Sequence, residues 1–235
     1  MLPGIACAAL LRPSSLAFSN TKSLAGGAGK SLVRDQGAGG SRRKMTFSFW
    51  ARTNSLLVTD VLTAAGSDTI FSFVAAGPRV SLNNNSSGYV GTTGVSFAIN
   101  TWYHILVHID TANATAASRC KIFVDGVDRS NVGAAIVQDY DTQWGNTVRG
   151  TVHAQTAGAN TVLIDELAKI DNDLLAATDF AFGGAPIDLS GLSFGNQGYW
   201  LRFSSFADIG VDSSGRGNGF TNSGFVSGDI SSTVP

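Results

Sequence analysis

The sequence has little charge of either sign. Lysine and arginine total 16, aspartate and glutamate total 17, and the formal net charge is -1. Charged residues make up only 14% of the chain, against roughly 25% in average soluble proteins. A chain without a positive field is poorly suited to collect polyphosphate or an anionic membrane surface. We therefore expect no nucleic-acid partner.

Cysteines and unbroken apolar runs are also scarce. Two cysteines, Cys7 and Cys120, cannot form a zinc site unaided, and whether they pair with each other stays open. Residues 80–109 carry no charge, but amides and hydroxyls at 83–88 interrupt them, so they do not predict a membrane span. The apolar segment 1–11 lacks a basic start and a cleavage site. It predicts an N-terminal arm rather than a signal peptide, and we expect no membrane insertion.

What is present favours an all-β fold. Hydrophobic residues reach 43%, enough for a sizeable core, and 28 glycines supply turns, while Lys/Glu-rich helical tracts are missing. Residues 45–51 alternate, with Met45, Phe47 and Phe49 on one face, which is the period of a strand. Similar patterns predict further strands at 31–33, 70–74, 95–99, 102–110, 121–127, 161–170 and 199–203. Their spacing without helical patterns is typical of an antiparallel jelly-roll β-sandwich, and Asp125-Gly126 predicts a hairpin turn.

Three zones follow from the change in pattern along the chain. Residues 1–43 predict an N-terminal arm or linker, 44–177 the β-sandwich with a short helical turn at 172–177, and 178–235 a Gly/Ser-rich C-terminal arm. A tail of this length is unusual in a lone monomer, so we expect it to lie across the sandwich or on a neighbouring subunit. The aromatic residues expected to anchor it in an assembly are Tyr199, Trp200, Phe203, Phe220 and Phe225.

The residues of catalytic and metal sites do not form a convincing pattern. His104 and His108 are four apart in a predicted strand, hence about 13 Å apart on one face, too far to share a metal. Asp165 and Glu166 are adjacent, so a strand would point them to opposite faces, whereas a retaining glycosidase needs two carboxyls about 5–5.5 Å apart. We predict no catalytic residue and no metal ligand, and Glu166 is the residue a depolymerase would need.

A binding loop is the remaining candidate site. Asn83, Asn84 and Asn85 form an amide-rich stretch whose side chains can bond sugar hydroxyls. Tyr89 and Trp144 are predicted to offer an apolar stacking face beside it. An ordinary polar turn is the alternative reading of the same residues.

Four segments, 46–52, 101–105, 121–127 and 164–170, together resemble laminin-G-like, concanavalin-A-like jelly-roll domains. The outer zones are similar to a narrower group, the virion structural or tail-fibre-like proteins of tailed bacteriophages. The segments that carry this second resemblance are the basic linker 41–44, the aromatic run 198–203 and the Asp-Ser-Ser-Gly-rich run 209–221.

This resemblance implies a non-enzymatic virion structural protein, made in the host cytoplasm, that acts in a tail or fibre and contributes to host attachment. A capsid decoration or head-fibre protein and a free carbohydrate-binding module are the alternatives. The implied partners are other virion proteins, further copies of the chain in a homo-oligomer with a trimer favoured, and a host cell-surface glycan. Laminin-G-like folds sometimes bind calcium, but no residue here matches a calcium set, so no cofactor is assigned.

Overall fold

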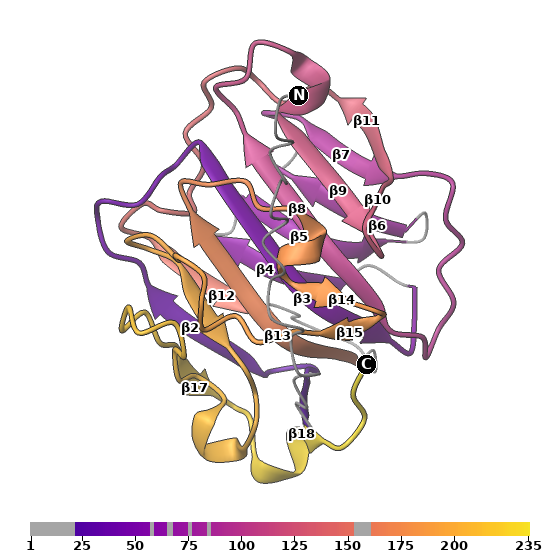
Figure 1. Ribbon diagram of the computed structural model, residues 1–235, viewed down its shortest axis with the longest axis vertical. Helices are drawn as coiled ribbons and strands as arrows, with labels where there is room; N and C mark the ends of the chain where they lie inside the picture. The colour runs from indigo at the N-terminus through magenta and orange to yellow at the C-terminus, as the bar shows by residue number, and fades with distance from the viewer. Residues whose placement is uncertain (1–21, 57–58, 65–67, 75–76, 84–85, 153–160) are drawn as a thin grey trace, which may run out of the picture.

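The computed structural model describes residues 22–56, 59–64, 68–74, 77–83, 86–152 and 161–235, and there it forms two large antiparallel sheets (Figure 1). The first sheet runs in the order β10 (Val127–Asp128), β9 (Cys120–Val124), β8 (Tyr103–Asp110), β3 (Lys44–Thr53), β13 (Val162–Asp171), β1 (Ser23–Ala25), β18 (Ile230–Ser231), and β16 (Tyr199–Leu201) also pairs with β13. The second runs β11 (Ser130–Ala134), β7 (Tyr89–Thr92), β6 (Gly77–Ser81), β5 (Asp68–Val74), β4 (Thr59–Ala64), β12 (Arg149–Val152), β2 (Ser31–Asp35), β17 (Thr221–Ser223). The predicted all-β jelly-roll sandwich is confirmed.

Most of the predicted strands exist, and one does not. Asp125 and Gly126 both have positive φ, at 49° and 78°, as a tight hairpin turn between β9 and β10 requires. Residues 95–99 form no strand, so that prediction is wrong. The segment ends at Asn100 with φ 61°, and Phe97 packs on Phe73 and Tyr103 from a loop. Its apolar alternation reflects this burial rather than ladder pairing. A one-turn helix (η2) forms at Ala177–Asp179, at the end of the predicted helical turn.

The main core lies between the two sheets. Met45, Phe47 and Phe49 of β3 face it, as their alternation predicts, and are fully buried. Phe49 meets Phe71 of β5 edge to face, with ring centroids 4.8 Å apart. Edge-to-face pairs of this kind add about 1 kcal/mol to the burial of the rings, which helps fix how the sheets face each other.

The C-terminal zone adds strands to this sandwich rather than leaving it. β16 pairs with β13, β17 with β2 and β18 with β1, all antiparallel. The five predicted anchors are buried within their own chain, and Phe203, for example, is fully covered. Of the two places expected for this zone, the structure shows the first, across the sandwich. This chain's own core takes the five side chains, which are therefore not available to a neighbouring subunit: Tyr199, Trp200, Phe203, Phe220, Phe225.

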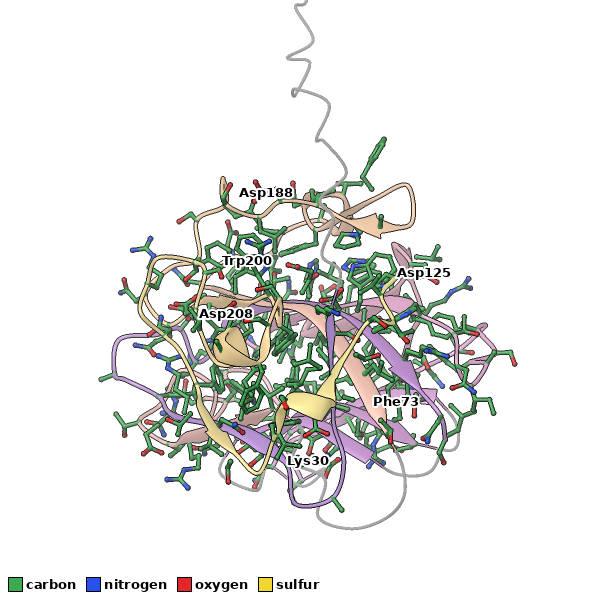
Figure 2. All side chains as sticks on the ribbon, turned by 90° about the horizontal axis from the view of Figure 1, so that it is seen from below. Lys30, Phe73, Asp125, Asp188, Trp200 and Asp208 are labelled. Carbon is green, nitrogen blue, oxygen red and sulfur yellow. The ribbon has the colours of Figure 1, made fainter. Side chains whose placement is uncertain are left out.

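A third, thinner layer covers the outer face of the first sheet. Residues 172–198, which include η2 and the small hairpin of β14 (Ala181–Phe182) and β15 (Ala185–Pro186), pack there through Phe180, Leu189 and Phe194. These side chains meet Leu106, Ala168, Ile170 and Trp200 in a second apolar cluster. Figure 2 shows the layer that carries Asp188 lying over Trp200. Both faces of the first sheet are thus covered, which explains why β3 is buried along nearly its whole length.

The N-terminal zone is also part of the sheets from residue 23 onward. β1 and β2 pair with β13 and β12, and the basic linker at 41–44 folds back, with Arg43 bound to Asp139 and Asp141. The first part of the predicted arm, residues 1–21 with Cys7, lies outside the described residues. Cys120 is buried and forms no disulfide with any described residue, and burial raises the pKa of its thiol to about 12. Among the residues described, no helix has the length and hydrophobicity of a membrane span.

Candidate ligand-binding pocket

A pocket of 410 Å³ opens between the outer face of the first sheet and the third layer. Its floor comes from the neighbouring strands β3 and β8, whose register places Trp50 opposite His104. One end is the β9–β10 turn at Asp125-Gly126, and the roof is η2 with the β14–β15 hairpin. The volume lies within the range of sites that bind small molecules.

Aromatic side chains line the pocket on two sides. Trp50 and Trp102 line the sheet side, and Phe182 lines the hairpin side with 73% of its surface exposed. The alternation of β3 puts Phe47 and Phe49 in the main core, so Trp50 must point outward, where the third layer leaves it only 5% exposed. The indole N–H groups of Trp50 and Trp102 are buried without a hydrogen-bond partner among the described residues. Buried donors left unpaired in this way are uncommon and costly.

The polar side of the pocket is formed by Asp125, Thr178 and His104. The backbone N–H of His104 donates to Asp125 Oδ1 at 2.8 Å, which ties the turn to β8. The His104 ring packs against Trp50 at a tilt of 40°, with centroids 5.2 Å apart, and its Nε2 is hydrogen-bonded to Ser48 Oγ at 2.8 Å. Burial lowers the pKa of His104 to about 4, so the ring is neutral at pH 7.

This neutral histidine predicts a loss of stability in acid. In the unfolded chain the pKa of His104 is near 6.5, whereas in the folded chain it is about 4. Between these two pH values the unfolded chain therefore binds a proton at His104 that the folded chain does not bind. The contribution of neutral His104 to the free energy of unfolding is therefore fully present above pH 6.5. It falls as the pH drops from 6.5 to 4, by up to about 3 kcal/mol at 1.36 kcal/mol per pH unit. We expect urea unfolding of His104→Gln to show a shallower fall over this range than the parent chain. Parallel curves for the two proteins would contradict the assignment.

The predicted asparagine loop lies elsewhere. Asn83 follows β6, on the second sheet, and its backbone N–H donates to Asp68 Oδ1 at 2.8 Å. Asn84 and Asn85 lie outside the described residues. Tyr89 is half-buried on β7, where Arg79 lies 5.9 Å from its ring centroid. Neither Asn83 nor Tyr89 lines the pocket.

Trp144 is a core residue. Its exposed fraction is 0%, and it meets the ring of Phe47 edge to face at 5.1 Å. The prediction that it offers a stacking face is wrong, because both faces of its ring are covered inside the sandwich. Sequence reasoning missed the pocket residues Trp50, Trp102 and Phe182. The outward register of Trp50 was a usable signal, but nothing local indicated the hairpin that completes the pocket.

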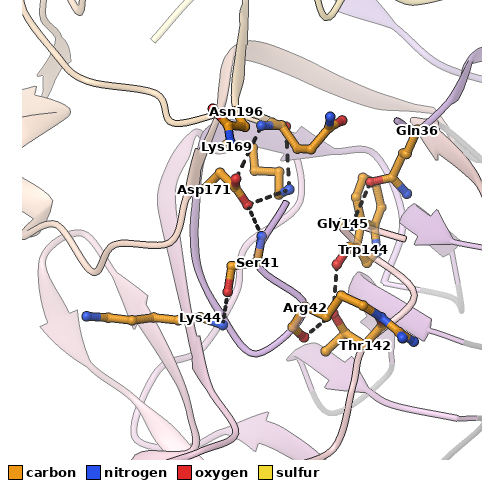
Figure 3. Close-up of polar contacts among 12 residues, drawn as sticks. Gln36, Ser41, Arg42, Lys44, Thr142, Trp144, Gly145, Lys169, Asp171 and Asn196 are labelled. Carbon is orange, nitrogen blue, oxygen red and sulfur yellow. Dashed lines mark hydrogen bonds and ion pairs between the residues drawn. The ribbon is translucent and has the colours of Figure 1, made fainter. Parts of the chain in front are cut away.

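A second, polar cavity of 540 Å³ lies beside Asp171 at the end of β13. Asp171 accepts bonds from the backbone N–H groups of Ser41 and Gln197, at 2.8 and 3.2 Å, and lies 3.6 Å from Lys169 Nζ (Figure 3). Burial lowers the pKa of Lys169 to about 8 against the opposing attraction of Asp171. The carboxylate of Asp171 thus links the 41–44 linker, β13 and the C-terminal zone, and we assign it a structural role.

The histidines and the adjacent carboxylates singled out in the sequence do not form one site. His104 and His108 do not meet, since His108 Nε2 is bonded to the Leu175 carbonyl at 2.7 Å. Asp165 and Glu166 sit at a β-bulge, where Glu166 has φ 48° and accepts a bond from the Trp200 indole. Both carboxylates are buried and neither lines the pocket. Among the residues described, no three histidine, cysteine or acidic side chains come together as a metal site would need.

Comparison with solved structures finds chains of related shape at low identity. A botulinum neurotoxin type C structure, reported for its interaction with two ganglioside molecules, matches with a TM-score of 0.47 and 13% identity over 65% of this chain and 40% of that one. The binding domain of botulinum neurotoxin DC in complex with SialylT gives 0.49 and 11%, over 68% and 42%. The heptameric SAP-like pentraxin of Limulus polyphemus gives 0.47 and 13%, over 68% and 80%. This chain thus spans about two fifths of the length of the toxin chains.

No curated protein sequence matches the chain. The profile of the concanavalin A-like lectin/glucanases superfamily matches residues 26–177, which run from the end of β1 through β13 to the start of η2. That range includes both strands that form the pocket floor, and it ends within the third layer. The two facing antiparallel sheets agree with this match, and the chain belongs to the concanavalin A-like lectin/glucanases superfamily.

Proposed function

We propose that this domain binds a glycan without cleaving it, in the pocket between β3, β8 and the β14–β15 hairpin. The observation that carries the proposal is that three aromatic side chains, Trp50, Trp102 and Phe182, line the pocket together with a carboxylate, and that Phe182 is exposed. The C–H faces of a sugar ring are apolar and stack on aromatic rings, while its hydroxyls need hydrogen-bond partners at the edge. The pocket supplies both, and the family to which the chain belongs includes lectins.

The lining of the pocket supports binding rather than hydrolysis. Glycosidases use two carboxyl groups that flank the scissile bond, about 5–9.5 Å apart. Among the described residues, the lining contains a single carboxylate, that of Asp125, and the buried Glu166 accepts a hydrogen bond from the Trp200 indole instead. We expect no release of reducing sugar from a glycan that the protein binds, which a reducing-end assay on the bound glycan measures.

Replacement of Phe182 tests the pocket directly. Phe182 is exposed, so Phe182→Ala removes a stacking face without opening the core. Loss of about 1 kcal/mol of stacking predicts an affinity about five times weaker for any glycan that the parent chain binds on an array. Phe206→Ala is the matched control, because Phe206 is 40% exposed and lies outside the pocket. Equal binding by the Phe182 variant, or an equal loss in the control, contradicts the assignment.

We further propose that the domain acts in a tailed-bacteriophage virion, in a tail or fibre that contributes to host attachment. The supporting observation is the resemblance of residues 198–203 and 209–221 to proteins of such particles, together with a site suited to a surface glycan. Labelling of intact particles with a gold-conjugated antibody against the sandwich tests it, and we expect label at the tail. Label over the head favours capsid decoration, and no label favours a free carbohydrate-binding module. Light scattering of the purified protein tests the proposed homo-oligomer, for which we favour a trimer.

A further inference from the structure

Among the described residues, the lining of the pocket carries one formal charge at neutral pH, and that charge is negative. Asp125 contributes it, and neither lysine nor arginine is among the described residues that line the pocket. His104 adds no charge, because its ring is neutral above about pH 4. A second carboxylate, Asp179, lies directly after the lining residue Thr178 and caps η2 through the Ala176 backbone N–H. The local field therefore favours uncharged or positive ligands.

Asp125 is held so that it can serve a ligand. It occupies the first position of the β9–β10 turn with φ 49°, and its side chain is exposed. Its Oδ1 accepts the His104 backbone N–H, which fixes the direction of the carboxylate. An ionised carboxylate has about four acceptor sites and no donor. The acceptor sites beyond this bond suit sugar hydroxyls, which donate, and do not suit a sugar carboxylate, which at neutral pH only accepts.

We propose that the pocket selects uncharged sugars over sugars that carry a carboxylate, such as uronic and sialic acids, and that Asp125 sets this selection. The inference rests on the glycan-binding function proposed above and narrows its ligand class. Hydroxyls of a neutral sugar gain charge-assisted hydrogen bonds to Asp125 while the sugar ring stacks on the exposed Phe182. A carboxylate in the same place meets a like charge, and at about 4 Å this repulsion amounts to a preference of about tenfold for the neutral sugar.

A glycan array built in matched pairs tests the selection. Each pair contains a neutral oligosaccharide and the same oligosaccharide with its C6 alcohols oxidised to carboxylates, and neutral chains are also compared with their sialylated forms. For every pair in which the intact protein binds either member, we expect the neutral member to bind about ten times more tightly.

The variant Asp125→Asn separates charge from structure. Asparagine tolerates positive φ, and its amide oxygen still accepts the His104 N–H, so the turn is retained. We expect the preference for neutral members to shrink to less than about twofold and their affinity to fall about fivefold. Asp128→Asn is the matched control. It removes the same charge from the next strand, where Asp128 pairs with Lys121 outside the pocket, and should leave the preference unchanged.

Failure of the proposed sugar selection can be distinguished from failure of the proposed glycan binding. If the acidic members bind as tightly as the neutral members or more tightly, the proposed selection is overturned. If Phe182→Ala also weakens that binding, the proposal that glycans bind in this pocket is retained. An unchanged preference in Asp125→Asn, or an equal shift in Asp128→Asn, overturns the role of Asp125. Failure of the intact protein to bind any glycan overturns the proposed function and the inference together.

Discussion

A chain that ends at residue 197 is expected to show no cooperative unfolding transition. The deletion removes β16, β17 and β18 and takes six large side chains out of the main core. These are Tyr199, Leu201, Phe203, Ile209, Phe220 and Phe225. Truncating a single buried side chain of this size costs about 2–5 kcal/mol, whereas a domain is stable by only about 5–15 kcal/mol. Circular dichroism and tryptophan fluorescence against temperature measure the transition.

The control is a chain that ends at Thr233. It keeps every described strand and the bond from Ser23 Oγ to the Thr233 carbonyl. We expect it to unfold cooperatively like the full chain. A sharp transition in the shorter chain would show that residues before 198 fold by themselves and would restore the interpretation of the C-terminal zone as an arm.

Gly198→Ala is expected to be the most damaging of the conservative substitutions. A Cβ at this position would lie 1.8 Å from the Phe194 carbonyl oxygen and 2.6 Å from that of Lys169. Both atoms are backbone, so neither can move aside without shifting β13 or the turn before β16. Overpacking typically costs about 1–3 kcal/mol where side chains can adjust, and more is expected here because backbone must move. We expect a loss of about 3 kcal/mol or more in urea unfolding.

Gly191→Ala provides the comparison within the same segment. Nothing lies within 4 Å of a Cβ at Gly191, so that substitution should change the free energy of unfolding by less than about 0.5 kcal/mol. If both variants are equally stable, the close approach of residues 194, 198 and 169 does not exist in solution.

The sandwich could be predicted because its long strands carry their own signal. In β3, the alternation over residues 45–51 indicates which side chains face the main core, and the Asp125-Gly126 pair indicates a turn with positive φ values. The same reasoning failed at 95–99, where burial in a loop gives the same alternation. A pattern of apolar residues reports contact with a core, not the hydrogen bonds that define a strand.

The pocket and the C-terminal zone could not be predicted for a different reason. Strands such as β16 and β18 are two or three residues long, too short for a period, and their partners lie far away in the sequence. The aromatic side chains of this zone were visible, but which surface they cover depends on pairing that no local window contains. For Trp50, the alternation of β3 predicts that the side chain points away from the main core. That the β14–β15 hairpin lies over it depends on tertiary packing, which no local pattern indicates. Trp144 was predicted to offer a stacking face, but it is fully buried, because an aromatic residue type alone does not say which surface covers it.

The pairing of β1 with β18 has a consequence for the order of events during synthesis. Ser23 lies opposite Ser231, so β1 cannot complete its pairing until β18 has been synthesised. A ribosome adds about 5–20 residues per second, which leaves the growing chain without this edge of its sheet for about 10 seconds or more. Contacts so distant in sequence also slow the folding search itself. Until β18 has been synthesised, the nascent chain therefore exposes the unpaired backbone groups of β1 at the edge of the first sheet. We expect the yield of folded protein in cells to depend on chaperones that bind this edge until β18 emerges.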